Sequence, residues 1–199
     1  MIIFRIRDFL SVMFYRLVWR YSFKRFGKKV HIVFPLRIMG SKYITLGDRV
    51  TLQMSAFINA ARIGMQEPNL VIEAGTMVGN FAHIICTQSV IIREKVLIAD
   101  KVYISDNLHT YENIEIPVWD QPIKQINPVE IGRGTWIGEN VCIIGAKIGR
   151  NCVIGANSVV TKDVPDYCIA AGSPAVIIKR YCSDTASWKK TDASGKFVN

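Results

Sequence analysis

The chain has 199 residues and half of them are hydrophobic, which suits one domain with a substantial core and argues against disorder. A balance of 25 Lys and Arg against 16 Asp and Glu gives a net charge of +9. This charge predicts attraction to an anionic partner, such as nucleic acid, a membrane surface or a phosphorylated small molecule. The five cysteines form no CxxC pair and no zinc-like spacing with histidine, so we expect reduced thiols and no metal site.

The N-terminal segment, residues 1–29, is predicted to contain a basic amphipathic helix over residues 2–26. Its charges leave no uncharged run near the roughly 20 residues that span a bilayer, and no small-residue cleavage site follows. We therefore expect the chain to stay in the cytoplasm. The helix is expected either to cap the edge of the following domain, which we favour, or to make peripheral contact with an anionic inner membrane. Nucleic-acid binding is not expected, because the basic residues alternate with apolar ones and no readout motif is visible.

A six-residue rhythm dominates the rest of the chain. An aliphatic residue recurs every six positions in groups of three, and the residue four places after it is usually small or β-branched. The aliphatic positions are Leu46, Leu52, Ile58; Ile72, Val78, Ile84; Ile92, Ile98, Ile104; Ile131, Ile137, Ile143; and Ile148, Ile154, Val160. A period of six fits neither a helix nor one long strand. It predicts an all-β solenoid of about five triangular coils, each made of three hexads, over residues 30–181.

The spacing fails only between the groups of three, which places every insertion at one corner of the predicted prism. The longest insertion, residues 110–130, begins directly after the segment "ISDNLH", which ends at His109. Insertions gathered on one side of a solenoid often form its binding face. His109 is therefore the first candidate for a functional residue.

The hexads, the segment "ISDNLH" and the stretch "IGANSVVTKDVPDYCIAAGSPAVIIKRY" resemble the left-handed β-helix acyltransferases of the hexapeptide-repeat class. Within that class the chain is most similar to bacterial lipopolysaccharide and capsule O-acetyltransferases. The resemblance covers about residues 44–181, and the left hand of the coil is implied by it. It also implies a homotrimer with sites between subunits that transfers acetyl from acetyl-CoA to a hydroxyl, with no metal.

The resemblance assigns roles to individual residues of this chain. It implies that His109 is the general base and that Trp136 lies at the acetyl-transfer site. Asn107 stands where related enzymes often carry a second histidine, and like His83 it is a candidate for contacting the acceptor. The residues expected to bind coenzyme A are Gly138, Ala156, Lys162, Gly172, Lys179 and Arg180. Val176 replaces a basic residue that the family pattern places there, which is why Arg180 is included.

The residues themselves suit this chemistry. Histidine has a pKa near neutrality and can take a proton from an alcohol, which is too weak an acid to attack a thioester unaided. Asp106 is a candidate for orienting the imidazole or binding the acceptor, and a solvated corner carboxylate is the alternative. The turn at Gly138 and Glu139 is a candidate N–H donor to the developing oxyanion. No serine nucleophile motif is present, so direct transfer in a ternary complex is expected rather than an acyl-enzyme.

The acceptor side is predicted from aromatic and polar residues. Tyr111 and Trp119 in the long loop suit stacking on sugar faces, although Trp119 could instead pin the loop to the prism. His83 is expected to point outward at a different corner from His109, so the two would meet only across a subunit boundary. The tail, residues 182–199, is expected to be frayed. A small-molecule acetyltransferase and a silent membrane-bound scaffold are the competing interpretations.

Overall fold

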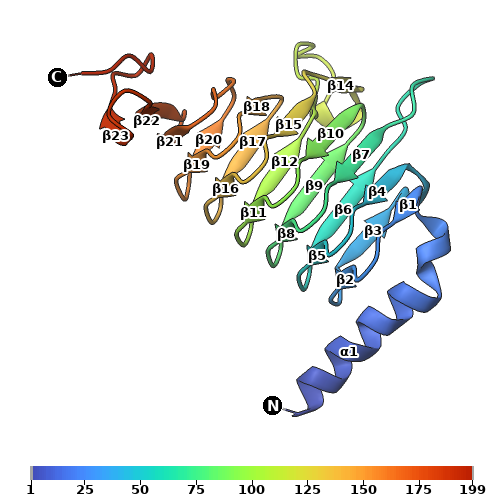
Figure 1. The fold of residues 1–199 in the computed structure, drawn as a ribbon. Helices are drawn as coiled ribbons and strands as arrows, with labels where there is room; N and C mark the ends of the chain where they lie inside the picture. Colours follow the sequence, from blue (N-terminus) through green and yellow to red (C-terminus); the bar gives the residue numbers. More distant parts are fainter. Residues whose placement is uncertain (1, 199) are drawn as a thin grey trace.

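The computed structural model describes residues 2–198, and the side chains of residues 6–198. Parallel strands wind into a three-sided prism, and the N-terminal helix lies at one end of it (Figure 1). Each face is one parallel sheet. We call these sheet A (β1-β4-β7-β10-β15-β18), sheet B (β2-β5-β8-β11-β16-β19, continued by β21-β22-β23) and sheet C (β3-β6-β9-β12-β17-β20).

Every coil contributes one strand to each sheet, in the order A, B, C. Six such coils occur within the described residues: β1 (Arg25–Phe26), β2 (His31–Ile32), β3 (Arg37–Met39); β4 (Ile44–Leu46), β5 (Thr51–Leu52), β6 (Phe57–Ala60); β7 (Asn69–Ile72), β8 (Met77–Val78), β9 (His83–Cys86); β10 (Ser89–Ile92), β11 (Leu97–Ile98), β12 (Tyr103–Ser105); β15 (Val129–Ile131), β16 (Trp136–Ile137), β17 (Cys142–Ile144); and β18 (Lys147–Ile148), β19 (Val153–Ile154), β20 (Val159–Val160). The five predicted coils are thus preceded by one more, at residues 25–39.

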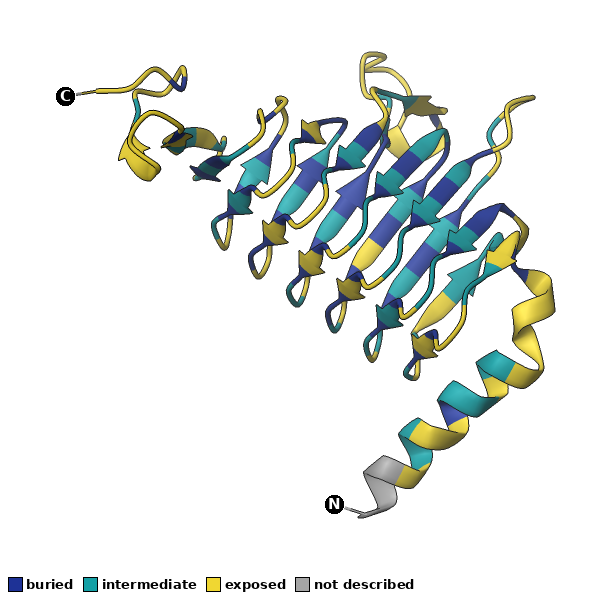
Figure 2. Cartoon of the chain, in the orientation of Figure 1, coloured by how far each residue is buried: buried dark blue, intermediate teal, exposed yellow. Residues whose placement is uncertain are grey.

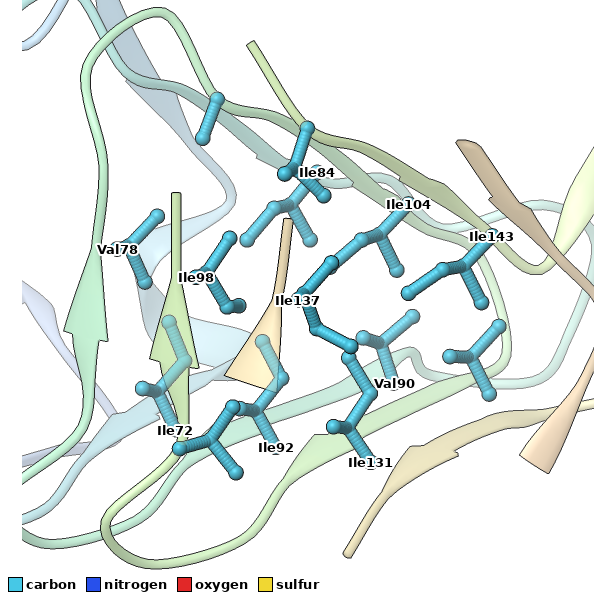
Figure 3. Packing of buried hydrophobic residues seen from close by; sticks show 14 of the residues in the cluster. Ile72, Val78, Ile84, Val90, Ile92, Ile98, Ile104, Ile131, Ile137 and Ile143 are labelled. Atoms are coloured by element: carbon cyan, nitrogen blue, oxygen red, sulfur yellow. The ribbon is translucent and has the colours of Figure 1, made fainter. Parts of the chain in front are cut away.

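The predicted aliphatic positions form the core. Residues such as Ile92, Ile98 and Ile104 are fully buried and stack on the equivalent residues of the next coil, Ile131, Ile137 and Ile143 (Figure 3). Burial alternates along most strands of the prism, for example β6, β7 and β10 (Figure 2), as expected when successive side chains point to opposite faces of a sheet. At roughly 25 cal/mol per Å² of apolar surface, this stacking is the main stabilising term of a solenoid.

The corners between sheets A and B and between sheets B and C follow from the fourth and fifth residues of a hexad. The fourth residue adopts a left-handed backbone, as in Lys95 (φ 56°) and Gly134 (φ 70°). The fifth is small and buried, as predicted, and where it is polar it bonds to the backbone: Thr135 Oγ1 donates to Gly149 O (2.8 Å). These corners let the chain turn without leaving polar groups unsatisfied.

The N-terminal helix is shorter than predicted. Helix α1 spans Ile2–Leu17, a 3-10 turn follows at Trp19–Ser22, and β1 at residues 25–26 already belongs to the first coil. One face of α1 lies over β2. Ser11 Oγ donates to Ile32 O and accepts from Phe34 N (both 3.0 Å), and Arg16 Nε donates to Val30 O (2.8 Å). The helix therefore caps the first coil. No described helix is long and apolar enough to cross a membrane.

The C-terminal tail is also more ordered than predicted. After β21 (Cys168–Ala171) the chain reverses into β22 (Val176–Cys182), which pairs antiparallel with both β21 and β23 (Ser187–Lys190). Trp188 packs on the Tyr181 ring at a centroid distance of 5.7 Å. The expectation of a frayed tail is wrong because this hairpin extends sheet B.

Candidate active site

All the long insertions leave from the corner between sheets C and A, which we call the C–A corner. They connect β6 to β7 and β12 to β15, and the break in the six-residue spacing between β9 and β10 falls at the same corner, so the prediction of a single insertion corner is confirmed. The longest of them starts after β12. It carries a two-stranded antiparallel ribbon, β13 (Asn107–His109) with β14 (Ile123–Gln125), which the sequence did not predict.

Asp106 anchors the root of this insertion. Its carboxylate is fully buried and accepts from the backbone N–H groups of Thr87, Gln88 and Ser89 at 2.7–3.1 Å, and from Thr87 Oγ1. It also accepts from Asn107 Nδ2 (3.1 Å). The carboxylate is thus saturated by the turn of the preceding coil. Its contacts support neither of its predicted roles, in orienting the His109 imidazole or in binding an acceptor, and they also exclude a solvated carboxylate.

His109 has the opposite environment. It ends β13 opposite Ile123, and its side chain is exposed to solvent at the base of the loop. None of the described residues hydrogen-bonds to the imidazole. The ribbon fixes the backbone beneath it, because Thr110 donates from both its N–H and its hydroxyl to Pro122 O (3.2 and 2.6 Å). A free imidazole on a fixed backbone suits proton transfer to a bound partner.

The loop beyond His109 is held together by Gln121, whose polar side chain suits hydrogen bonds to sugar hydroxyls but is used within the loop. Gln121 is nearly buried, and its side-chain amide donates to the carbonyl oxygens of Asn113 and Ile116 (both 2.8 Å). Trp119, in the 3-10 turn Val118–Asp120, is 87% exposed, and Tyr111 is exposed as well. Trp119 therefore does not pin the loop to the prism within one chain. Both rings are available to a ligand or a neighbouring chain.

His83 is the first residue of β9, on the edge of sheet C that borders sheet B, and its side chain points outward. Its imidazole packs edge-on between Phe57 and Tyr103, at centroid distances of 4.5 and 5.5 Å. Partial burial lowers the pKa of His83 below its ordinary value. The separation from His109 across sheet C agrees with the prediction that the two histidines lie at different corners.

The residues expected near the acetyl group lie on sheet B and at the corner between sheets B and C. Trp136 is half exposed on sheet B, between Leu97 and Val153 of the flanking coils. Gly138 and Ala156 stack on successive coils, because a Cβ at Gly138 would overlap the backbone of Ala156. Gly172 follows on the next layer, where its N–H donates to Ser158 Oγ (3.1 Å).

The amide of Gly138 is already engaged, since it donates to Ile154 O at 2.9 Å as part of the parallel ladder. An amide committed to the ladder cannot also donate to an oxyanion. The contacts therefore do not support Gly138 as the oxyanion donor. A role in letting a ligand approach the backbone closely is still compatible with its small size.

Lys162 lies back at the C–A corner, directly after β20. It lines a pocket of about 310 Å³ together with polar, apolar and tail residues: Thr161, Asp163, Val164, Pro165, Ala170, Pro174, Ala175, Val176, Ile177, Ala193 and Ser194. Lys179 is exposed on β22, and Arg180 donates to Gly195 O (3.4 Å). The predicted coenzyme A residues thus divide between two corners of one chain and are not gathered in a single pocket.

A larger depression, about 610 Å³, lies where sheets A and B meet and contains none of the predicted site residues. Most of its charged side chains pair with one another or with neighbours: Arg93 with Glu73 and Glu130, Arg150 with Asp166 (2.7–2.9 Å), and Arg133 with Glu94 (3.3 Å). We interpret these pairs as a ladder that ties successive coils together.

The thiols near the site are poor nucleophiles. Burial raises the pKa of Cys86 to about 12 and that of Cys152 to about 11, so neither forms a thiolate at neutral pH. Cys86 also points into the core while His83, three residues earlier on the same strand, points out. The two cannot form a nucleophile–base pair.

The sequence of this chain is similar to those of several known proteins. Residues 128–162 match the hexapeptide repeat of succinyl-transferase. WbbJ of Escherichia coli K12, whose name describes an O-acetyl transferase of lipopolysaccharide biosynthesis, is 33% identical over 167 residues, or 80% of this chain and 83% of WbbJ. Rv3034c of Mycobacterium tuberculosis, named as a probable acetyltransferase, is 42% identical over 83 residues, which are 41% of this chain and only 26% of that protein.

Solved structures show the same fold. A variant of AntD, an N-acyltransferase from Bacillus cereus in complex with dTDP and coenzyme A, superimposes with a TM-score of 0.70 at 18% identity, covering 85% of this chain and 90% of AntD. A maltose O-acetyltransferase from Clostridium difficile 630 gives 0.54 at 23% identity, covering 89% and 88%. The fold is the left-handed parallel β-helix of acyltransferases. The chain belongs to the hexapeptide-repeat acetyltransferase family, and it is an enzyme of that class.

Proposed function

We propose that the chain is a homotrimeric O-acetyltransferase that moves an acetyl group from acetyl-CoA to a sugar hydroxyl of a bacterial surface polysaccharide or its lipid-linked precursor. The observation that carries the proposal is His109, an exposed imidazole without a hydrogen-bond partner among the described residues, which projects from a fixed ribbon beneath a loop with two exposed aromatic rings. The similarity to WbbJ over most of both chains supports an acceptor of this kind. Acetyl-CoA as the donor would place the reaction in the cytoplasm.

The residues of this chain fit an acyl-CoA donor. The pocket beside Lys162 has both apolar and polar lining residues, so its apolar part suits a pantetheine arm, and the Lys162 ammonium can pair with a phosphate. The strands that lead to His109 and Lys162, β12 and β20, lie two positions apart in sheet C. At about 4.8 Å per strand, the two residues start from points separated by about 10 Å along the prism axis. Base and donor would therefore share the C–A corner.

Transfer would proceed in one covalent step. The His109 imidazole takes the proton of the acceptor hydroxyl while the hydroxyl oxygen attacks the thioester carbonyl carbon. The C–O bond to the acceptor forms and the C–S bond to coenzyme A breaks. The imidazolium then gives the proton to the departing thiolate. The high thiol pKa values of Cys86 and Cys152 support direct transfer over an acyl-cysteine.

Trp136 lies on sheet B, across the prism from the C–A corner. Side chains on opposite sides of one prism cannot line the same site. We therefore place each active site between two subunits of the trimer, with His109 from one chain and Trp136 from its neighbour. On this arrangement, the exposed rings of Tyr111 and Trp119 and the half-buried Phe57–His83–Tyr103 column would contact the acceptor or the adjoining subunit.

A smaller sugar is the second candidate acceptor. Another AntD variant was solved with dTDP-4-amino-4,6-dideoxyglucose and the Clostridium relative is named for maltose, so this fold accepts free or nucleotide-linked sugars in other proteins. The test is to incubate the purified protein with acetyl-CoA and a panel of polysaccharides, lipid-linked oligosaccharides and free sugars. Thiol release with an acetyl ester on a glycan supports the proposal. Transfer confined to free sugars would favour the second candidate, and transfer to none would contradict both.

A further inference from the structure

Helix α1 carries an apolar face that none of the described residues covers. Ile6, Phe9, Leu10, Phe14 and Leu17 follow one another at helical spacing of three and four residues and are all exposed, with Phe9 at 61% and Leu17 at 64%. The opposite face is the one that caps the first coil, through Ser11 and Arg16. The cap therefore uses only half of the helix.

The apolar face continues onto the neighbouring structure. A groove between α1 and the first coil is lined by Leu10, Ser11, Phe14, Tyr15, Phe34 and Pro35. Trp19 and Tyr21 after the helix are also exposed, the latter at 82%. Aromatic residues of this type favour the boundary between headgroups and acyl chains.

The excess positive charge of the molecule is concentrated at the same end. Residues 1–50 hold 11 Lys and Arg against two Asp, while the remaining 149 residues hold 14 basic and 14 acidic residues. The whole net charge of +9 thus belongs to the N-terminal quarter. No acidic residue occurs between Asp8 and Asp48, and five cations that follow the helix are exposed: Arg20, Lys24, Arg25, Lys28 and Lys29.

We propose that α1 and these cations dock the enzyme on an anionic lipid bilayer, with the apolar face of the helix lying in the headgroup region. An interfacial helix combines a continuous apolar face with nearby basic residues, which is the combination found here. A second copy of this chain is a less suitable occupant, because two such ends would bring like charges together. This inference goes beyond the proposed reaction, since docking does not require transfer.

The test is co-sedimentation of the full-length protein with vesicles. One set contains phosphatidylcholine alone and the other about one-third phosphatidylglycerol. Binding to the anionic vesicles, weakened by salt, is expected. Lys24→Gln/Lys28→Gln/Lys29→Gln should weaken it roughly a hundredfold, at about fivefold per lysine. The matched control, Lys189→Gln/Lys190→Gln/Lys196→Gln, removes the same charge from the opposite end and should bind like the wild type.

Phe9→Gln/Leu17→Gln tests the apolar face without disturbing the core, because both side chains are exposed. Weaker vesicle binding with an unchanged oligomeric mass supports the proposal. Unchanged vesicle binding with a smaller oligomer would assign the face to a second copy and overturn it. Equal binding to neutral and anionic vesicles, or equal losses in the two lysine variants, would also overturn it. Transfer to a soluble acceptor, measured separately, reports on the reaction and not on docking.

Discussion

Asp106 and His109 are three residues apart and have opposite environments. The Asp106 carboxylate is buried under the backbone N–H groups of residues 87–89, while the His109 imidazole is exposed and unpartnered within the described chain. The carboxylate binds the insertion to the preceding coil, and the ribbon then carries the imidazole outward. The acidic residue thus contributes to the site by fixing the backbone from which the base projects.

Asp106→Ala should therefore lower the free energy of unfolding by about 3 kcal/mol, because it leaves several buried N–H donors without an acceptor. Thermal or denaturant unfolding measures the change, with the exposed Asp120→Ala as the control that should leave stability nearly unchanged. An Asp106→Ala variant of wild-type stability with a large loss of kcat would contradict the structural role and restore a direct part in catalysis.

His83 should titrate below the ordinary histidine value of about 6.5, because partial burial between Phe57 and Tyr103 disfavours the charged ring. The folded state then prefers the neutral form. Its contribution to stability is present above about pH 6.5 and is lost as the pH falls through the lower folded pKa. An NMR titration of the imidazole protons measures this pKa. Phe57→Ala should raise it, and a wild-type value at or above 6.5 would contradict the burial argument.

At the scale of the element, the turn that links a strand of one sheet to a strand of the next is the repeated feature of the fold. The fourth residue of the hexad is left-handed in both glycine and non-glycine corners, and Lys95 and Gly134 occupy this position on successive coils between sheets A and B. A left-handed backbone strains any residue with a Cβ. A Cβ at Gly134 would in addition overlap the side chain of Asn151.

Lys95→Gly should therefore raise the free energy of unfolding by about 0.5–1 kcal/mol, and Gly134→Ala should lower it by more than that. The two variants make opposite changes at equivalent corners, so each is the control for the other in denaturant unfolding. Stability changes of the same sign in both variants would show that backbone strain does not dominate at these corners.

The six-residue period predicted most of the prism, because each of the three faces of a coil buries an aliphatic residue and these residues recur every six positions in the sequence. The first coil was missed although Phe26, Ile32 and Ile38 keep the six-residue spacing, since basic residues and aromatic side chains mask it. The ribbon β13–β14 is short and its burial pattern does not alternate, so no period indicates it. His109 was predictable from its position, whereas the burial of Asp106 depends on contacts with the preceding coil.

At the scale of the whole molecule, the predicted site residues occupy different sides of one prism. His109 and Lys162 are at the C–A corner, and Trp136 is on sheet B. A triangular solenoid cannot bring these together within one chain. A trimer that places the corner of one chain against sheet B of the next would complete three equivalent sites.

Mixed trimers test this arrangement. His109→Ala and Trp136→Ala homotrimers should each be nearly inactive, but co-expressed chains should recover roughly one quarter of the wild-type activity, because about one interface in four then pairs an intact histidine with an intact tryptophan. As the control, the two variant homotrimers are purified separately and then mixed under conditions in which they do not exchange subunits. No recovery in trimers shown to be mixed would place both residues in the same chain's site.

The most direct test of the account is the His109→Ala variant itself, compared with wild type and with His31→Ala, an exposed histidine at the far end of the prism. Acetyl-CoA binding by calorimetry, thermal stability and transfer to the acceptor are measured for all three. The account predicts equal binding and stability for His109→Ala with transfer reduced about 10²–10⁴-fold, and full activity for His31→Ala. A fully active His109→Ala enzyme would contradict it.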